Sequence, residues 1–466
     1  MTDRFHVTYL LTLAPGEDPE ERIRELQLEQ SVELPDGVVH SLGMQHVTGS
    51  VTELNLIGEP ESPGEPESIG EPKSTGKPES IGEPESPGKA KTSGDVGTTG
   101  KQGSSHRSEA AASGASAGSG VWPRQVQVTI AWPKSNHGNG ITQFLNLLFG
   151  NISMKRGIAI TGIRWEDVSG GDIVSGGEAA IGDSSRLLAG PALGIHRIRE
   201  MWGVHGRALA CTALKPMGYS SEKLADLAYR FALGGVDIIK DDHGLADQPT
   251  APFAERVRLC VEAVDRAAQK TGRRSRYFPN ITTDPHHVTE CFEQAADLGA
   301  DGVLIIPMLV GPALIHHLAR LGTGLPIMAH PAFSGTFIAH DAALRPGLSP
   351  GAPHASAPSL HGFEPGLFYG GLMRALGADF TIYPNIGGRF SFTSEVCDAI
   401  NSHARNSSLP FAPCFPAPGG GMQRDRMAFW LEKYGADTTF LMGGSLFEDP
   451  AGIESASRAF MKTMGA

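Results

Sequence analysis

The run Lys240-Asp241-Asp242-His243 follows the apolar segment Val236–Ile239 and offers two carboxylates and an imidazole. Carboxylate oxygens are hard ligands and an imidazole nitrogen is a borderline one, so the run is a candidate site for Mg²⁺ or another divalent ion. A protonated Lys240 would repel such an ion. It fits the site if CO₂ converts its amine to a carbamate, which supplies an anionic oxygen. The alternative is an ion pair between Lys240 and its acidic neighbours.

Polar residues and glycines also follow other short apolar segments. Lys215 is a candidate proton carrier, provided that burial lowers its pKa, or else a solvated lysine. His330 is a candidate catalytic residue or a hydrogen-bonded core histidine. Asn280 and Arg389 occupy comparable positions. Glycine amides that could hold a phosphate, or that form simple turns, are those of Gly419, Gly420, Gly421, Gly443 and Gly444.

These candidates end eight apolar segments that alternate with amphipathic helical stretches from Arg207 onward. This alternation predicts βα units, and eight such units predict a closed (β/α)8 TIM barrel within an α/β chain. Catalytic groups of such barrels sit at the carboxyl ends of the strands. The predicted strands are Ala208–Leu214, Val236–Ile239, Arg276–Asn280, Gly302–Ile306, Pro326–Ala329, Asp379–Ile382, Pro413–Pro416 and Thr438–Met442.

The amino-terminal part of the chain predicts a smaller α+β domain. Strand-like His6–Leu13 and Val126–Trp132 accompany the helix-like segments Asp18–Val32 and Ile141–Phe149. Between them, a repeated Gly-Glu-Pro-x-Ser unit passes into a Ser/Gly/Ala tract, which cannot bury a core. We therefore expect a ferredoxin-like α+β domain at 1–57 and 121–165, a disordered insertion at 58–120, and a catalytic (β/α)8 domain at 166–466.

The composition is that of an ordinary soluble enzyme. The net charge is -12, from 39 basic and 51 acidic residues, and no block of Lys and Arg is available to neutralise a phosphate backbone. Nucleic acid is therefore not expected as a partner. No apolar run approaches the ~20 residues that cross a bilayer, and the first residues lack a signal-peptide core. We expect a cytoplasmic protein without a membrane partner.

The stretch 210–249 resembles the RuBisCO large-subunit superfamily. In that family a strand ending in Lys-Pro is followed by Gly-Gly-x-Asp-x-x-Lys-Asp-Asp-Glu and then by Gln-Pro. Similar motifs cover almost the whole chain outside the insertions. They are Glu29-Gln30-Ser31, Phe149-Gly150-Asn151, Tyr277 to Thr282, His330 and the glycines at 419–421 and 443–444.

The resemblance implies a role for each matching position. Lys240 would be the carbamylated lysine, Asp242 and His243 metal ligands, and Lys215 the proton-transfer lysine. The glycines would hold a substrate phosphate. The implied cofactor is Mg²⁺, with another divalent ion possible because of His243.

The same resemblance implies shared active sites. Glu29 and Asn151 match residues that reach the active site of a neighbouring subunit. A homodimer with two composite sites is therefore expected, acting on a phosphorylated small molecule.

Several departures from the family pattern argue against ribulose-bisphosphate carboxylation. His243 stands where the family's Lys-Asp-Asp-Glu motif has glutamate, and Met217 stands where the family has a second lysine. The mobile-loop lysine has no counterpart in Ile386 to Phe390, although Arg389 could supply a cation. The chain resembles a RuBisCO-like protein of the fourth, non-carboxylating form.

The metal ligands, the lysine and the glycines that do match the family imply an Mg-dependent enzyme that stabilises an enediolate. The expected reaction is decarboxylation of a phosphorylated keto-sugar acid, of the 3-oxo-isoapionate 4-phosphate type, or isomerisation of a phosphorylated keto sugar. One alternative is the diketo-methylthiopentyl-phosphate enolase of methionine salvage. Another is a non-catalytic protein that binds a metabolite and has a regulatory role.

Overall fold

The computed structural model describes residues 3–14, 16–57, 125–138, 140–169, 187–188, 190–339, 360–388, 390 and 392–466. The predicted insertion at 58–120 lies outside these residues. Among the described helices, none combines the length and the apolar character needed to cross a membrane.

The amino-terminal sheet is built on a strongly alternating strand. In β1 (Arg4–Thr12) every second residue is buried, which gives the strand one core face. It lies between β3 (Gln125–Pro133) and β4 (Ile158–Ile163), and β2 (Ser50–Ile57) pairs with the far side of β3. All these pairs are antiparallel.

Helices complete this unit. Helix α1 (Pro19–Glu29) and the short α2 (Asp36–Ser41) connect β1 to β2, and α3 (Ile141–Phe149) connects β3 to β4. The resulting βαββαβ order with strands in the sequence β4-β1-β3-β2 is the ferredoxin-like arrangement. It confirms the predicted α+β fold. A fifth strand, β10 (Gly362–Phe363), joins the sheet by pairing in parallel with β4.

Eight parallel strands form the second sheet, and all eight predicted strands are confirmed. Their spatial order is β7-β6-β5-β13-β12-β11-β9-β8, and a bridge between Asn280 and Leu304 connects the two outermost strands. The sheet therefore closes into the expected barrel. The bounds are β5 (Leu209–Leu214), β6 (Ile238–Asp241), β7 (Arg276–Phe278), β8 (Val303–Ile305), β9 (Ile327–Ala329), β11 (Phe380–Pro384), β12 (Phe415–Gly419) and β13 (Thr439–Leu441).

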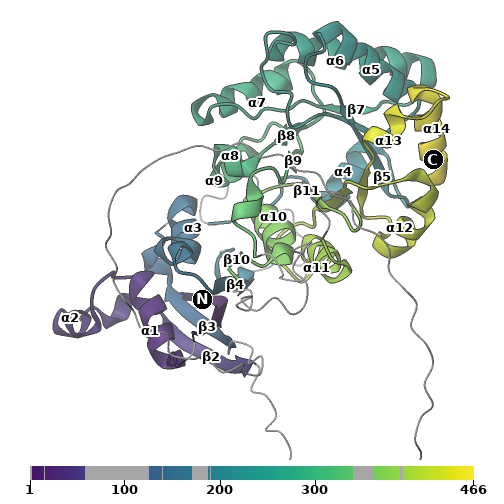
Figure 1. Cartoon of the computed structure of the whole chain (residues 1–466). Helices are drawn as coiled ribbons and strands as arrows, with labels where there is room; N and C mark the ends of the chain where they lie inside the picture. Colours follow the sequence, from purple (N-terminus) through teal and green to yellow (C-terminus); the bar gives the residue numbers. More distant parts are fainter. Residues whose placement is uncertain are drawn as a thin grey trace, which may run out of the picture. The chain divides into compact units, whose positions relative to one another are not determined.

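Amphipathic helices lie outside the strands, as right-handed crossovers require (Figure 1). Helix α6 is followed by Gly272, whose left-handed conformation stops the helix before β7. The main helices are α5 (Ser221–Leu233), α6 (Phe253–Thr271), α7 (Val288–Asp297), α9 (Ala313–Ala319), α10 (Met373–Leu376), α11 (Ser394–Arg405), α12 (Met427–Tyr434) and α14 (Ile453–Thr463).

A further helix, α4 (Gly194–Trp202), closes the amino end of the barrel. Its Ile195 and Ile198 belong to the same buried cluster as Leu209 and Ile238, the first residues of β5 and β6. Its last residue, Trp202, stacks at 6.0 Å on the first residue of β11. The polar groups that follow the strands lie at the carboxyl end of the barrel, opposite to this helix.

Candidate active site

The carboxyl ends of β5 and β6 bring Lys215 and Asp242 together. The two strands are parallel neighbours whose register aligns Leu214 with Asp241. Lys215 and Asp242 are the next residues on each strand, and the Lys215 Nζ lies 3.5 Å from the Asp242 Oδ1. At this distance the pair attracts electrostatically without a short hydrogen bond.

His243 approaches the same carboxylate oxygen. Its Nδ1 lies 3.4 Å from the Asp242 Oδ1. Burial on its own raises the pKa of Asp242, but the hydrogen bond with His243 and the positive charges of Lys240 and Lys215 outweigh burial and lower the pKa below its usual value. Asp242 is therefore ionised at neutral pH, as a metal ligand must be.

Lys240 is buried on β6, with 1% of its surface exposed. Its Nζ donates to the backbone carbonyl of Asp241 at 3.0 Å. Burial lowers the pKa of Lys240, although the charge of Asp242 acts in the opposite direction. A lowered pKa increases the fraction of neutral amine, which is the form that reacts with CO₂.

His330 follows β9 and faces the same region. Its ring stacks on that of His243 with centroids 4.8 Å apart and an angle of 18°. Burial lowers the pKa of His330 well below its usual value, and the charges of Lys240 and His243 add to this effect. The Nδ1 accepts from the backbone N–H of Ala332 at 3.1 Å, which places the proton of the neutral ring on Nε2.

Asn280 is buried and contacts the backbone of His243. It is 1% exposed, and its Nδ2 donates to the backbone carbonyl of His243 at 3.1 Å. Its Oδ1 accepts from the backbone N–H of Thr282 at 3.1 Å. Both ends of the amide are thus engaged within the protein, and these contacts make Asn280 a residue that positions His243.

Asp241 belongs to a separate cluster, although the sequence presents it as part of one run with Asp242. It is fully buried and forms an ion pair with Arg256, whose Nε lies 3.1 Å from the Asp241 Oδ2. The other oxygen accepts from the Tyr277 hydroxyl at 2.8 Å. Arg256 is on α6 and Tyr277 on β7, and no local sequence signal connects either to Asp241.

The glycine loops after β12 and β13 lie on neighbouring strands, since Gly419 aligns with Leu441. Gly421 has a φ of +68°, and a Cβ there would lie 2.8 Å from the Cα of Gly388. Only glycine permits this close approach of two loops. The Ser445 Oγ donates to the Met422 carbonyl at 3.4 Å and links the two glycine loops. Gly443 precedes, and Gly444 begins, the short helix α13 (Gly444–Phe447).

Two predicted residues, Glu29 and Asn151, are not brought into this group. The Asn151 Nδ2 donates to the Glu29 Oε1 at 3.2 Å, so these residues contact each other in the amino-terminal unit. Lys155 approaches the other oxygen of Glu29 at 3.5 Å. Arg389 lies outside the described residues.

The side chains present do not complete a metal site without modification. Within the described ranges, no three His, Cys, Asp or Glu side chains converge closely enough to hold an ion. Asp242 and His243 offer two donors. A third donor, the second anionic one, would come from Lys240 as a carbamate, so the residues fit a divalent ion when that amine is modified.

Apolar side chains around this end of the barrel were not singled out as functional by the sequence. Met217, Leu309 and Phe333 follow β5, β8 and β9 and are 62%, 50% and 61% exposed. Phe333 also has a φ of +64°, which is rare for a large side chain. Their positions after the strands place them at the carboxyl end of the barrel, and ligand sites commonly include apolar side chains.

Comparisons with known proteins identify the family of the chain. Residues 194–348 match the family model for the ribulose bisphosphate carboxylase large chain, catalytic domain. The 5-methylthioribulose-1-phosphate isomerase of Rhodospirillum rubrum is 34% identical over 72% of this chain and 80% of that protein. The 2,3-diketo-5-methylthiopentyl-1-phosphate enolase of Geobacillus kaustophilus is 30% identical over 73% and 75%. The chain is a RuBisCO-like member of the RuBisCO large-chain superfamily.

The solved structures give the same family. The crystal structure of a RuBisCO-like protein from Rhodopseudomonas palustris superposes with a TM-score of 0.68 and 26% identity, covering 100% of this chain and 98% of that one. The predicted recognition and the predicted fold class are therefore confirmed. Within this RuBisCO-like frame, His243 remains the residue that departs from the Lys-Asp-Asp-Glu run.

Proposed function

We propose that this RuBisCO-like protein is an enzyme that forms an enediolate from a phosphorylated keto sugar and isomerises it. The observation that carries the proposal is the position of Lys215 beside the ionised Asp242, at 3.5 Å, where the stacked pair His243 and His330 also converges. A base, an anionic group and a neutral hydrogen-bond donor are the groups that move a proton next to a carbonyl.

Lys215 is the proposed proton carrier. Its side chain is 39% exposed, so it lacks the burial that the sequence analysis required of a proton carrier, but a substrate can reach the amine. The contact with Asp242 is loose enough for the amine to turn toward a ligand. The negative charge of Asp242 favours uptake of the substrate proton by the neutral Lys215 amine.

His330 is the proposed donor to the developing oxyanion. Because Nδ1 is occupied by the backbone of Ala332, the ring presents Nε2–H as a neutral donor. Burial keeps the ring uncharged, and a neutral donor stabilises an oxyanion without transferring its own proton. The stacked His243 fixes the orientation of the ring.

A divalent ion bound by carbamylated Lys240, Asp242 and His243 would polarise the substrate carbonyl. The glycine amides at 419–421 and 443–444 are the proposed phosphate site. The apolar Met217 and Phe333 favour a substrate with an apolar tail at the other end, as in the methylthio sugar phosphate named for the Rhodospirillum rubrum relative.

Enolisation of a diketo-methylthiopentyl phosphate is a second candidate, favoured by the similarity to the Geobacillus kaustophilus enolase. Both reactions begin with removal of a proton next to a carbonyl. Decarboxylation is also an expectation from the sequence. Neither of these two relatives is named for that reaction, so isomerisation has the stronger support.

The test uses 5-methylthioribulose 1-phosphate in D₂O with Mg²⁺ and bicarbonate. Wild type should exchange a substrate proton and release an isomer. Lys215→Met should slow exchange by about 10²- to 10⁴-fold, the usual contribution of a positioned acid–base group. Lys223→Met is the matched control, because Lys223 is an exposed lysine of α5.

Full exchange in Lys215→Met would remove Lys215 as the base. Exchange with the diketo phosphate but not with the methylthioribulose phosphate would select the enolase instead. CO₂ release from a keto-sugar acid phosphate, without exchange in either of the other two substrates, would overturn the isomerase proposal.

A further inference from the structure

A polar cavity lies at the amino end of the barrel, away from the candidate active site. It is bounded by the loop between α4 and β5, by Asp237 just before β6, and by the segment Gly272–Arg276 that enters β7. Lys215 and Asp242 follow the same strands at their other ends. Since β5 has six residues, the two ends are separated by about 20 Å at ~3.3 Å per residue.

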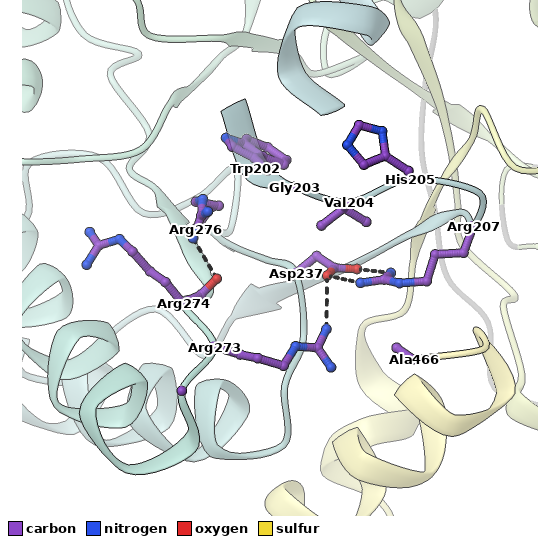
Figure 2. A pocket seen from close by; sticks show the side chains of 11 residues that line it. Trp202, Gly203, Val204, His205, Arg207, Asp237, Arg273, Arg274, Arg276 and Ala466 are labelled. Carbon is purple, nitrogen blue, oxygen red and sulfur yellow. Dashed lines mark hydrogen bonds and ion pairs between the residues drawn. The ribbon is translucent and has the colours of Figure 1, made fainter. Parts of the chain in front are cut away.

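The cavity has a volume of about 480 Å³, within the range of roughly 300–1,000 Å³ of small-molecule sites. The residues that line it include one aspartate, Asp237, and four arginines, Arg207, Arg273, Arg274 and Arg276. Arg207 and Arg273 reach Asp237, whereas the side chain of Arg274 points away from it (Figure 2). His205 also lines it and would add positive charge if protonated.

Two of the arginines form close ion pairs with carboxylates of the protein. Arg207 holds both oxygens of Asp237 at 2.6 and 2.7 Å, and one of these oxygens also accepts from the backbone N–H of Ala210. Arg274 contacts both oxygens of Asp301 at 3.1 and 3.2 Å. The charges of these two arginines are thus matched by carboxylates.

The other two arginines have spare hydrogen-bonding capacity. Arg273 is 49% exposed, and the one ion pair that it forms with described residues, with Asp237, is long at 3.7 Å. Arg276 donates to the Arg274 carbonyl at 2.6 Å, while its Nε is 4.0 Å from Asp301. Each guanidinium carries five N–H donors, so within the described residues most donors of this pair lack a protein acceptor.

Arg276 is also held in place. Its guanidinium lies over the Trp202 ring at 5.6 Å, and its side chain is 16% exposed. Burial lowers the pKa of Arg276, and neighbouring Arg274 adds to the effect, although Asp301 and Asp237 oppose it. A bound anion would offset the burial of this charge.

We propose that this cavity binds a small anion carrying a phosphate or pyrophosphate group, held by Arg273 and Arg276. Planar guanidinium forks match phosphate oxygens in geometry and charge. Two such groups at the wall of one cavity provide the paired donors that a pyrophosphate requires. The site is separate from the phosphate site proposed at the glycine loops and does not depend on it.

The test is calorimetric titration of the full chain with inorganic pyrophosphate at low salt. Arg273→Gln should weaken binding at one site by about tenfold or more, because a charge-assisted hydrogen bond is lost. Arg258→Gln is the matched control, since Arg258 is an exposed arginine of α6 that pairs with Glu262 outside the cavity. It should leave the isotherm unchanged. Added NaCl should weaken the affected site, as expected for an exposed ion pair.

The number of sites separates this inference from the proposed function. If the glycine loops also bind pyrophosphate, wild type shows two sites and Arg273→Gln keeps one. If they do not, wild type shows one site, and this is the site that Arg273→Gln weakens. An identical isotherm for wild type and Arg273→Gln, or no binding to wild type, would overturn the proposal.

Discussion

At the end of β6, Asp241 is fully buried and both of its oxygens accept hydrogen bonds. Asp242, the next residue, is 23% exposed and lies 3.5 Å from the Lys215 amine and 3.4 Å from the His243 ring. Asp241 belongs to a scaffold cluster with Arg256, Tyr277 and Asn280. Asp242 belongs to an open cluster with Lys215, His243 and His330.

The difference separates charges that hold the fold from charges that remain available to a ligand. In the scaffold cluster, contacts of 2.8–3.1 Å join β6 to β7 and α6. The contacts to Asp242 are longer, so little free energy is lost when they rearrange around a substrate or an ion. We therefore expect changes in the scaffold cluster to affect stability, and changes in the open cluster to affect chemistry.

The largest effect on stability is expected from Arg256→Met, which leaves the buried Asp241 charge without its ion-pair partner. Breaking such a pair costs about 3–5 kcal/mol. Urea denaturation should show a lower free energy of unfolding. Arg258→Met, two residues along the same helix and 52% exposed, should change it by less than about 1 kcal/mol.

A double variant sharpens this prediction. Asp241→Asn combined with Arg256→Met removes both charges and should be more stable than Arg256→Met alone, because no buried charge is left unpaired. If Arg256→Met were as stable as wild type, the scaffold assignment of Asp241 would be wrong.

An intermediate effect is expected from Asn280→Ala, because Asn280 joins the two clusters. Its backbone N–H donates to Asp241, and its side chain donates to the carbonyl of His243. The substitution leaves that carbonyl and the Thr282 N–H without their partner, at a cost of about 1–3 kcal/mol in denaturation experiments. Thr323→Ala, in an exposed turn, is a suitable control. Equal stability of the two variants would contradict this role.

The fold follows from patterns that are local in the sequence. The eight barrel strands are short apolar runs separated by amphipathic helices. The bounds predicted for each strand differ from the observed bounds by only a few residues. Strand β10 has only two residues and pairs with β4, some 200 positions earlier in the chain. A pairing of that kind depends on tertiary contacts, which local periodicity does not record.

The site could be predicted in part. A residue that follows a buried strand is expected at the carboxyl end of the barrel, and Lys215, Asp242 and His330 satisfy that geometry. The division between Asp241 and Asp242 was not predictable, because it depends on which side chain faces Arg256. The arginine cavity was also not predictable, since its residues come from three segments that are separate in the sequence.

The smallest effect is expected for Asp242→Asn. The pKa of Asp242 is lower in the folded chain than its usual value of 3.8. Its ionised form therefore stabilises the fold above about pH 4, and this contribution is lost as the pH falls toward the folded pKa. Because the side chain is partly exposed, the contribution should be about 1 kcal/mol or less.

Denaturation in the presence of a chelator should show wild type slightly more stable than Asp242→Asn at pH 7, with the difference shrinking between pH 4 and pH 2. The control is Asp226→Asn, which removes an exposed carboxylate of α5. A difference that grows as the pH falls would mean that burial, and not the surrounding cations, dominates at Asp242. In that case the cations of the open cluster would not hold Asp242 ionised, and its assignment as an available ligand would fail.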